Sequence, residues 1–299
     1  MENENCKYLI ESAYDLHMQI GPDIMPRKLN DAHMYERAVA AGMAGFSPRS
    51  HYHDTGERCA LLNAGQSSTK AIGAISLNQS VGGINPYAVE IAARGGTKLV
   101  WFPTQDSKKA RSVLNSGKPI EKLPHWAKVV LDMEINGVAS EPIYILDNVG
   151  KLIEPVYDTL DIISRHDMTL FTGNISYEEA IALVKAARER KVERIVVAMV
   201  DHPAVNYSLK QQKEFAAYGA YMEHCYNTYA GGKVELAEAL HQIKAIGHER
   251  VIISSDLGQP SGIYPDEGML AYAQELVKAG FSETEVKQMT GGNAGRLLS

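Results

Sequence analysis

The sequence has few cysteines, no long apolar run and no basic cluster, and each absence excludes a class of protein. Its three cysteines, Cys6, Cys59 and Cys225, lie far apart and form no CxxC pair. This spacing excludes a disulfide framework and a zinc site built from cysteine alone. No apolar run approaches the roughly 18 residues that a membrane-spanning helix needs, and the sequence begins without a basic and then apolar leader. We therefore expect a cytoplasmic protein that does not bind membranes.

The charge balance is negative, with 30 Lys and Arg residues against 36 Asp and Glu residues. Without a basic run, such a chain is poorly suited to binding phosphate backbones, so we expect no nucleic-acid partner. The 45% hydrophobic content is enough for a large core. A length of 299 residues is compatible with one α/β barrel domain over residues 1–299. The expected partner is a small-molecule substrate.

Apolar runs of strand length alternate with amphipathic segments along most of the chain. The runs that predict strands span 13–18, 44–49, 72–77, 98–103, 168–173, 194–200, 220–226 and 250–256. The segments that predict helices span 29–42, 85–96, 176–191, 208–219 and 233–247. Nearly continuous apolar strands that alternate with helices indicate a parallel sheet covered on both faces. Eight such strands predict a closed (β/α)8 TIM-type barrel, and a doubly wound open sheet is the alternative.

Residues 106–150 interrupt this alternation after the fourth predicted strand. The stretch 127–152 contains two alternating apolar runs separated by glycine-containing breaks. That pattern predicts a β-hairpin inserted into the barrel. We expect it to act as a lid or a packing flap.

Polar residues follow the predicted strands, at the rim where parallel barrels carry their chemistry. Asp15, His17 and Gln19 alternate at the end of the first strand and so share one face. The other polar residues that follow or end a strand are Arg49, His51, Asn78, Asn174, Asp201, His202, Glu223, His224, Asn227 and Asp256. Imidazoles and carboxylates at one rim suit Zn²⁺ or a similar divalent ion, which takes nitrogen and oxygen ligands and activates a water.

These segments together resemble the amidohydrolase superfamily. They are DLHMQIGPD at 15–23, SHYH at 50–53, TGNIS at 172–176, DHP at 201–203, SSDLGQ at 254–259 and GGNAGRLL at 291–298. More closely, they resemble an uncharacterised branch whose members carry Asp-Leu-His-x-His-x-Gly-Pro-Asp, Ser-His-Tyr, Thr-Gly-His-x-Ser and Ser-Ser-Asp-Leu-Gly-Gln. The resemblance covers nearly the whole chain. It implies a (β/α)8 barrel, metal-assisted hydrolysis of an amide, lactone or related bond, and a homo-oligomer.

The sequence departs from the superfamily pattern at expected metal ligands. Gln19 stands where strand one brings a second His, Asn174 stands where strand five brings a His, and the bridging Lys or Glu of strand four has no counterpart. The ligands that the resemblance carries over are His17, His202 and Asp256. Two imidazoles and one carboxylate suffice for a catalytic zinc with one open position. The expected cofactor is one divalent metal, zinc with manganese or iron as alternatives, and a metal-free site is the other interpretation.

The resemblance also implies roles for the rim residues. Asp256 corresponds to the carboxylate that takes the proton of the attacking water, so it is the predicted general base. His202 is a second catalytic candidate as a donor to a carbonyl oxygen, and His51 is a third. Arg49, with its planar fork, is expected to hold a substrate carboxylate together with His51. The remaining predicted substrate-binding residues are Gln19, Asn78, Asn174, Glu223 and Asn227.

The predicted function is metal-assisted hydrolysis of a small polar cyclic amide, ureide or lactone at a mononuclear site, with Asp256 as general base. One alternative keeps the site but makes it a lyase or decarboxylase that acts on a small carboxylate. Another is a metal-free barrel that binds a ligand or uses acid/base chemistry only. Bound metal separates the first two interpretations from the third, and carbon dioxide release separates the lyase from the hydrolase.

Overall fold

The structure of the protein is a computed structural model, and it describes residues 4–65 and 67–299. Its nine strands in the described residues are β1 (Tyr14–Met18), β2 (Gly45–Pro48), β3 (Lys70–Ala71), β4 (Ala74–Ser76), β5 (Leu99–Trp101), β6 (Thr169–Phe171), β7 (Ile195–Val197), β8 (Tyr221–Cys225) and β9 (Val251–Ser254). Every predicted strand run contains one of them. The observed strands are shorter than predicted because several runs leave the sheet at the rim.

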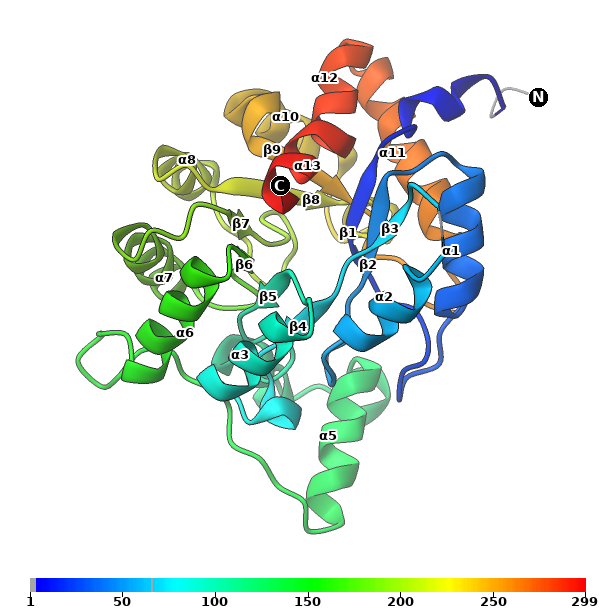
Figure 1. Ribbon diagram of the computed structural model, residues 1–299. Coiled ribbons are helices and arrows are strands. Elements are labelled where there is room, and N and C mark those ends of the chain that lie inside the picture. Colours follow the sequence, from blue (N-terminus) through cyan, green and yellow to red (C-terminus); the bar gives the residue numbers. More distant parts are fainter. Residues whose placement is uncertain (1–3, 66) are drawn as a thin grey trace.

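Helices follow most strands and surround them (Figure 1). The α-helices are α1 (Asp31–Ala40), α2 (Gly56–Leu62), α3 (Pro86–Arg94), α4 (Lys108–Arg111), α5 (His125–Ile135), α6 (Glu154–Arg165), α7 (Tyr177–Glu189), α8 (Leu209–Ala217), α9 (Tyr226–Ala230), α10 (Leu236–Ile246), α11 (Pro265–Lys278), α12 (Glu283–Lys287) and α13 (Asn293–Leu298). All five predicted helices are present. Among the described residues, no helix is long and apolar enough to cross a membrane.

The strands form a parallel ring in chain order, which confirms the predicted (β/α)8 fold class. One ladder joins β1, β2 and β3, and a second joins β4 through β9. β3 and β4 are two parts of one barrel strand interrupted at residues 72–73, because the Ile72 N–H still bonds Phe46 O of β2. The ring closes between β9 and β1, where the Asp256 N–H donates to His17 O and the Gln19 N–H donates to Leu257 O.

The inside of the ring is packed with apolar side chains below the rim. Leu16, Leu99, Trp101, Phe171 and Ile252 belong to this inner cluster, and α13 adds Ala294 and Leu297 to it. Figure 1 shows α13 across the centre of the ring, so the chain's C-terminus covers one end of the barrel. The opposite end, where the strands finish, is therefore the one that carries polar side chains.

The predicted β-hairpin after the fourth barrel strand is wrong. Residues 125–135 form helix α5, which lies at the edge of the molecule in Figure 1. The rest of the insertion contains the short helix α4 and 3-10 turns at Ser112–Asn115 and Ile120–Lys122. Its β-structure is limited to isolated bridges, one between Ser107 and Ile143 and one between Leu146 and Leu152. The apolar residues of this segment fit both a period of two and an i, i+4 spacing, and the glycine that follows the helix, Gly137, has a φ of +81°, which is typical of a helix end.

Candidate active site

His17 occupies the centre of the rim because β1 is irregular there. The pairing of β1 with β2 shifts register between Asp15 and Met18. Asp15 is fully buried, and its Oδ1 accepts the backbone N–H groups of His17 and Ser255, each at 3.1 Å. Burial raises the pKa of Asp15 to about 7, although Ser255 and His17 oppose the rise. Asp15 thus fixes the backbone of β1 against β9 and leaves the His17 ring for other partners.

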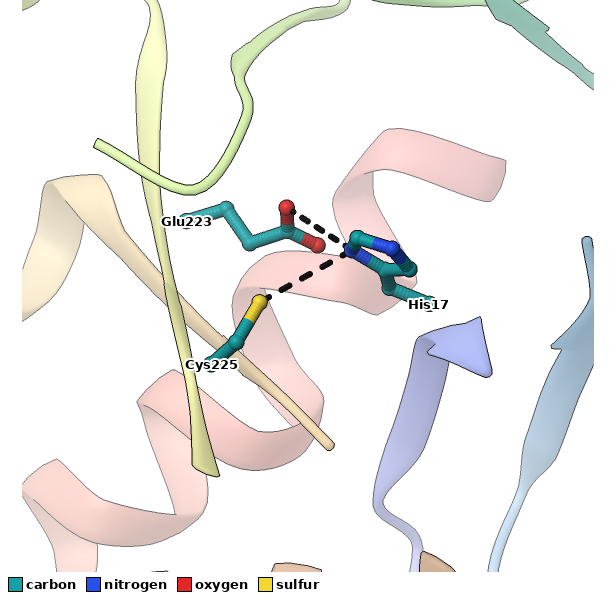
Figure 2. A group of neighbouring side chains, drawn as sticks. All are labelled: His17, Glu223 and Cys225. Atoms are coloured by element: carbon teal, nitrogen blue, oxygen red, sulfur yellow. Dashed lines mark hydrogen bonds and ion pairs between the residues drawn. The ribbon is translucent and has the colours of Figure 1, made fainter. Parts of the chain in front are cut away.

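Glu223 and Cys225 lie on β8 and both face the His17 ring (Figure 2). The two residues share a face because successive strand side chains alternate. The Oε2 atom of Glu223 lies 3.2 Å from His17 Nδ1, and the Cys225 sulfur lies 3.7 Å from the same nitrogen. All three side chains are buried, and their donor atoms lie within 4.8 Å of one another. Glu223 also accepts the Ser254 hydroxyl at 2.8 Å and the Met199 N–H at 3.2 Å.

Asp256 lies at the other ring nitrogen of His17, just beyond β9. Its Oδ1 is 3.3 Å from His17 Nε2, without the alignment of a hydrogen bond, and it accepts the Gln19 amide at 3.0 Å. Its Oδ2 accepts the Asn227 amide at 3.3 Å. Burial acts to raise the pKa of Asp256, but the charges of His17, Lys233 and Arg49 outweigh it and hold that pKa below its ordinary value. The carboxylate is therefore ionised and held in place by two amides.

Arg49 and His51 form a second group, beyond β2. Both guanidinium Nη atoms lie close to the His51 ring, at 3.1 and 3.3 Å from its two nitrogens, and the guanidinium lies over the Trp101 ring at 4.7 Å. His51 Nδ1 is 2.7 Å from the Thr104 hydroxyl, which accepts an N–H of Asn78 at 2.6 Å. Burial, and then the charge of Arg49, lower the pKa of His51 well below its ordinary value, so the ring is neutral.

The predicted residues His202 and Asn174 lie outside these contacts. β7 ends at Val197, and the chain then turns with Met199 at a φ of +48°. His202 follows in this turn, and its Nδ1 accepts the Ala204 N–H at 3.0 Å. Burial lowers its pKa to about 4. Asn174 is held through its backbone, and its Oδ1 is buried without a hydrogen-bond partner.

The predicted ligand set of His17, His202 and Asp256 stays a prediction. Within the residues described, the group of potential metal donors that lies together is His17, Glu223 and Cys225. Glu223 was predicted to bind substrate, and Cys225 was not singled out. The strand alternation that includes Glu223 also includes Cys225, so the signal was present in the sequence. His224 faces the other side of β8 and pairs with Asp201, with Nδ1 and Oδ2 2.9 Å apart.

Comparison with solved structures defines the class of fold. The chain resembles an amidohydrolase from Pseudomonas aeruginosa at a TM-score of 0.60 and 10% identity, with 99% of this chain and 98% of that chain covered. It also resembles the probable dipeptidase PvdM from the same organism, at a TM-score of 0.62 and 13% identity, with 99% and 97% covered. The lactonase Lmo2620 from Listeria monocytogenes gives a TM-score of 0.56 and 12% identity, with 97% and 95% covered. The fold is therefore that of amidohydrolase-type barrels.

The particular family follows from the sequence itself. Residues 12–223 match the family described as "Family of unknown function (DUF6282)", which is more than half of the chain. The protein belongs to this family. No curated protein matches the sequence.

Proposed function

We propose that the protein is a metal-dependent hydrolase of a small polar cyclic amide, ureide or lactone, and that His17, Glu223 and Cys225 hold one zinc ion. The observation that supports this proposal best is the convergence of three buried donors, one nitrogen, one oxygen and one sulfur, at the rim of the barrel. Solved structures with the same fold include an amidohydrolase and a lactonase.

The donor spacing fits a tetrahedral zinc ion. Zinc–ligand bonds of about 2.0–2.3 Å put neighbouring donors roughly 3.3–3.6 Å apart, and the two separations from His17 Nδ1 are 3.2 Å to Glu223 and 3.7 Å to Cys225. Three protein ligands with one open position are typical of catalytic zinc sites. A thiolate ligand favours zinc over magnesium or manganese. The Cys225 thiol is buried with a raised pKa, so it is protonated without an ion beside it.

In this proposal the residues of the site have separate roles. A bound ion would supply polarisation of the substrate carbonyl and a more acidic water. Asp256 is ionised and lies next to His17 without belonging to the three-donor group, so it is free to accept a proton from the attacking water. Gln19 and Asn227 orient its carboxylate. Ser254 and the Met199 N–H orient Glu223.

Elemental analysis of protein purified without chelators or a metal-affinity tag tests the metal site first. We expect close to one zinc per chain, lost in Cys225→Ser and His17→Gln. Cys59→Ser is the matched control because Cys59 is also a buried thiol but lies outside the site, and this variant keeps its zinc. A wild-type chain that stays empty after incubation with excess Zn²⁺ refutes the metal site.

Activity is tested on a panel of cyclic amides, ureides and lactones. We expect turnover that falls at least about 100-fold in Asp256→Asn, as loss of a general base predicts. A lyase or decarboxylase is the second candidate, and the observation that favours it is the buried Arg49 guanidinium, a donor group that suits the carboxylate of such a substrate. Release of carbon dioxide from carboxylate substrates, without hydrolysis of the panel, would replace the first proposal with this one.

A further inference from the structure

Arg49 is a buried cation with no carboxylate partner, which distinguishes it from the other buried arginines. Arg49 is only 3% exposed, yet no carboxylate oxygen among the described residues lies within 4.0 Å of its guanidinium nitrogens, the distance of an ion pair. Arg27 pairs with Asp23 at 2.6 Å, and Arg111 bonds Asp106 through its Nε at 2.9 Å. Buried charges in proteins are normally paired, and the described residues hold no such partner for Arg49.

The hydrogen bonds of Arg49 are also incomplete. Its Nε is buried and has no acceptor. Both Nη atoms approach the ring of His51, but a neutral imidazole has one acceptor nitrogen, and the Thr104 hydroxyl already contacts Nδ1. The Nε–H therefore remains free, and together with a second N–H of an Nη atom it would form the two-pronged donor that matches a carboxylate.

The position of Arg49 places these free donors beside the proposed reaction centre. Arg49 follows β2 and lies over Trp101, whose ring also contacts the His17 ring at a centroid distance of 4.7 Å. Trp101 thus lies against both the cation and the central imidazole. One small molecule bound to Arg49 could therefore also reach His17.

We propose that Arg49 binds a carboxylate of the substrate, so that the substrate class is a carboxylate-bearing cyclic amide, ureide or lactone. This inference rests on the proposed function. Trp101 covers one face of the guanidinium group, and the His51 ring contacts both of its Nη atoms. Two carboxylates, Asp256 and Glu223, act on Arg49 electrostatically without forming an ion pair with it.

Binding of small carboxylates tests this assignment without turnover. The probes are propionate and succinate, and propionamide is the neutral control. The readout is the fluorescence of Trp101 in a Trp126→Phe background, because the chain has two tryptophans. We expect propionate and succinate to change the signal and propionamide to leave it unchanged. Arg49→Met and Arg49→Lys are expected to raise the dissociation constant about 10- to 100-fold, the loss of a bidentate charged pair. Arg111→Lys, the paired control, leaves it unchanged.

The outcomes separate this inference from the proposed function. Carboxylate binding that is equal in wild type and in both Arg49 variants overturns it, and so does the absence of binding to wild type. The titration is repeated after chelator treatment, because a carboxylate held only by a metal ion is then lost, which also overturns the assignment. Arg49-dependent binding in a chain that holds no metal and hydrolyses nothing supports Arg49 while the proposed function fails. Hydrolysis of neutral substrates at full rate in Arg49→Met supports the function and overturns the substrate class.

Discussion

The substitution Glu223→Gln is predicted to weaken zinc binding strongly while the protein still folds. Glu223 is fully buried and accepts three hydrogen bonds, from the Ser254 hydroxyl, the Met199 N–H and His17 Nδ1. Glutamine has the same shape, and with its oxygen at the Oε2 position it still accepts from Met199 and His17. Its amide nitrogen then faces the Ser254 hydroxyl, which can turn to accept. Every polar group in the pocket keeps a partner.

The expected stability cost follows from this geometry. Hydrogen bonds to a charged group contribute about 1.5–3 kcal/mol and neutral ones about 0.5–1.5 kcal/mol, so three weakened bonds cost about 3–4.5 kcal/mol. The neutral amide is cheaper to bury than the carboxylate, which reduces the net loss to about 1–2 kcal/mol. Glu223→Leu leaves the Met199 N–H and His17 without acceptors, and we expect it to cost about 3–5 kcal/mol.

Two assays separate the effects. Urea unfolding in the presence of chelator measures the free energy of unfolding, and competition with a chromophoric chelator measures zinc affinity. Zinc affinity of Glu223→Gln should fall by more than the roughly 10- to 100-fold that loss of an outer partner costs. Glu179→Gln is the control, because Glu179 is a buried helix-capping carboxylate away from the site. Zinc affinity within a factor of about ten of wild type would show that Glu223 is not a ligand.

Three further predictions concern the rest of the molecule. Burial raises the pKa of Cys59 to about 12 and also raises the pKa of Cys225. At pH 7.5 a thiol reagent should therefore label only the partly exposed Cys6 in the native chain, and all three cysteines after unfolding. Rapid labelling of Cys59 in the native chain would contradict this prediction. Leu297→Ala removes a buried side chain at the closed end of the barrel and should cost about 2–5 kcal/mol in urea unfolding, whereas Leu61→Ala, at a position 80% exposed, should cost almost nothing. The pKa of His202 in the folded chain is about 4, below the ordinary value of 6.5, so the unfolded chain binds more protons between these pH values and the free energy of unfolding falls as pH drops from 6.5 to 4. His202→Gln should flatten that part of the plot of stability against pH. An unchanged slope would refute the lowered pKa of His202.

Strands and the longer helices could be predicted from the sequence because their periodicity is sustained. Helix α6 carries an equally clear signal, with Pro155 near its start and buried Val156, Leu160 and Ile163 on one face, but it is not among the predicted helices. Helix α5 is different, since Ile135 is 83% exposed and most of its apolar residues are not buried. A short segment with little burial contains no periodicity that decides between helix and strand.

The rim could be located from the sequence, but its contacts could not. Strand alternation places Glu223 and Cys225 together, whereas the position of His202 depends on where β7 ends. The left-handed conformation of Met199 ends that strand early, and it has no signature in the sequence because Met rarely adopts it. The contact of Arg49 with Trp101 joins the segment after β2 to β5, and no spacing along the chain indicates such a contact.

The departure at Gln19 and the donor at Cys225 are both consistent with the proposed site. A second histidine at position 19 would add an imidazole beside Asp256, where the structure instead has the Gln19 amide donating to Oδ1. The amide donor orients the Asp256 carboxylate, but it adds no strong metal ligand on this side of His17. On the other side of the ring, Cys225 adds the sulfur that Glu223 and His17 lack for a three-donor group. In the proposed site the ion lies at Nδ1 of His17, and Asp256 on the Nε2 side is available as a base.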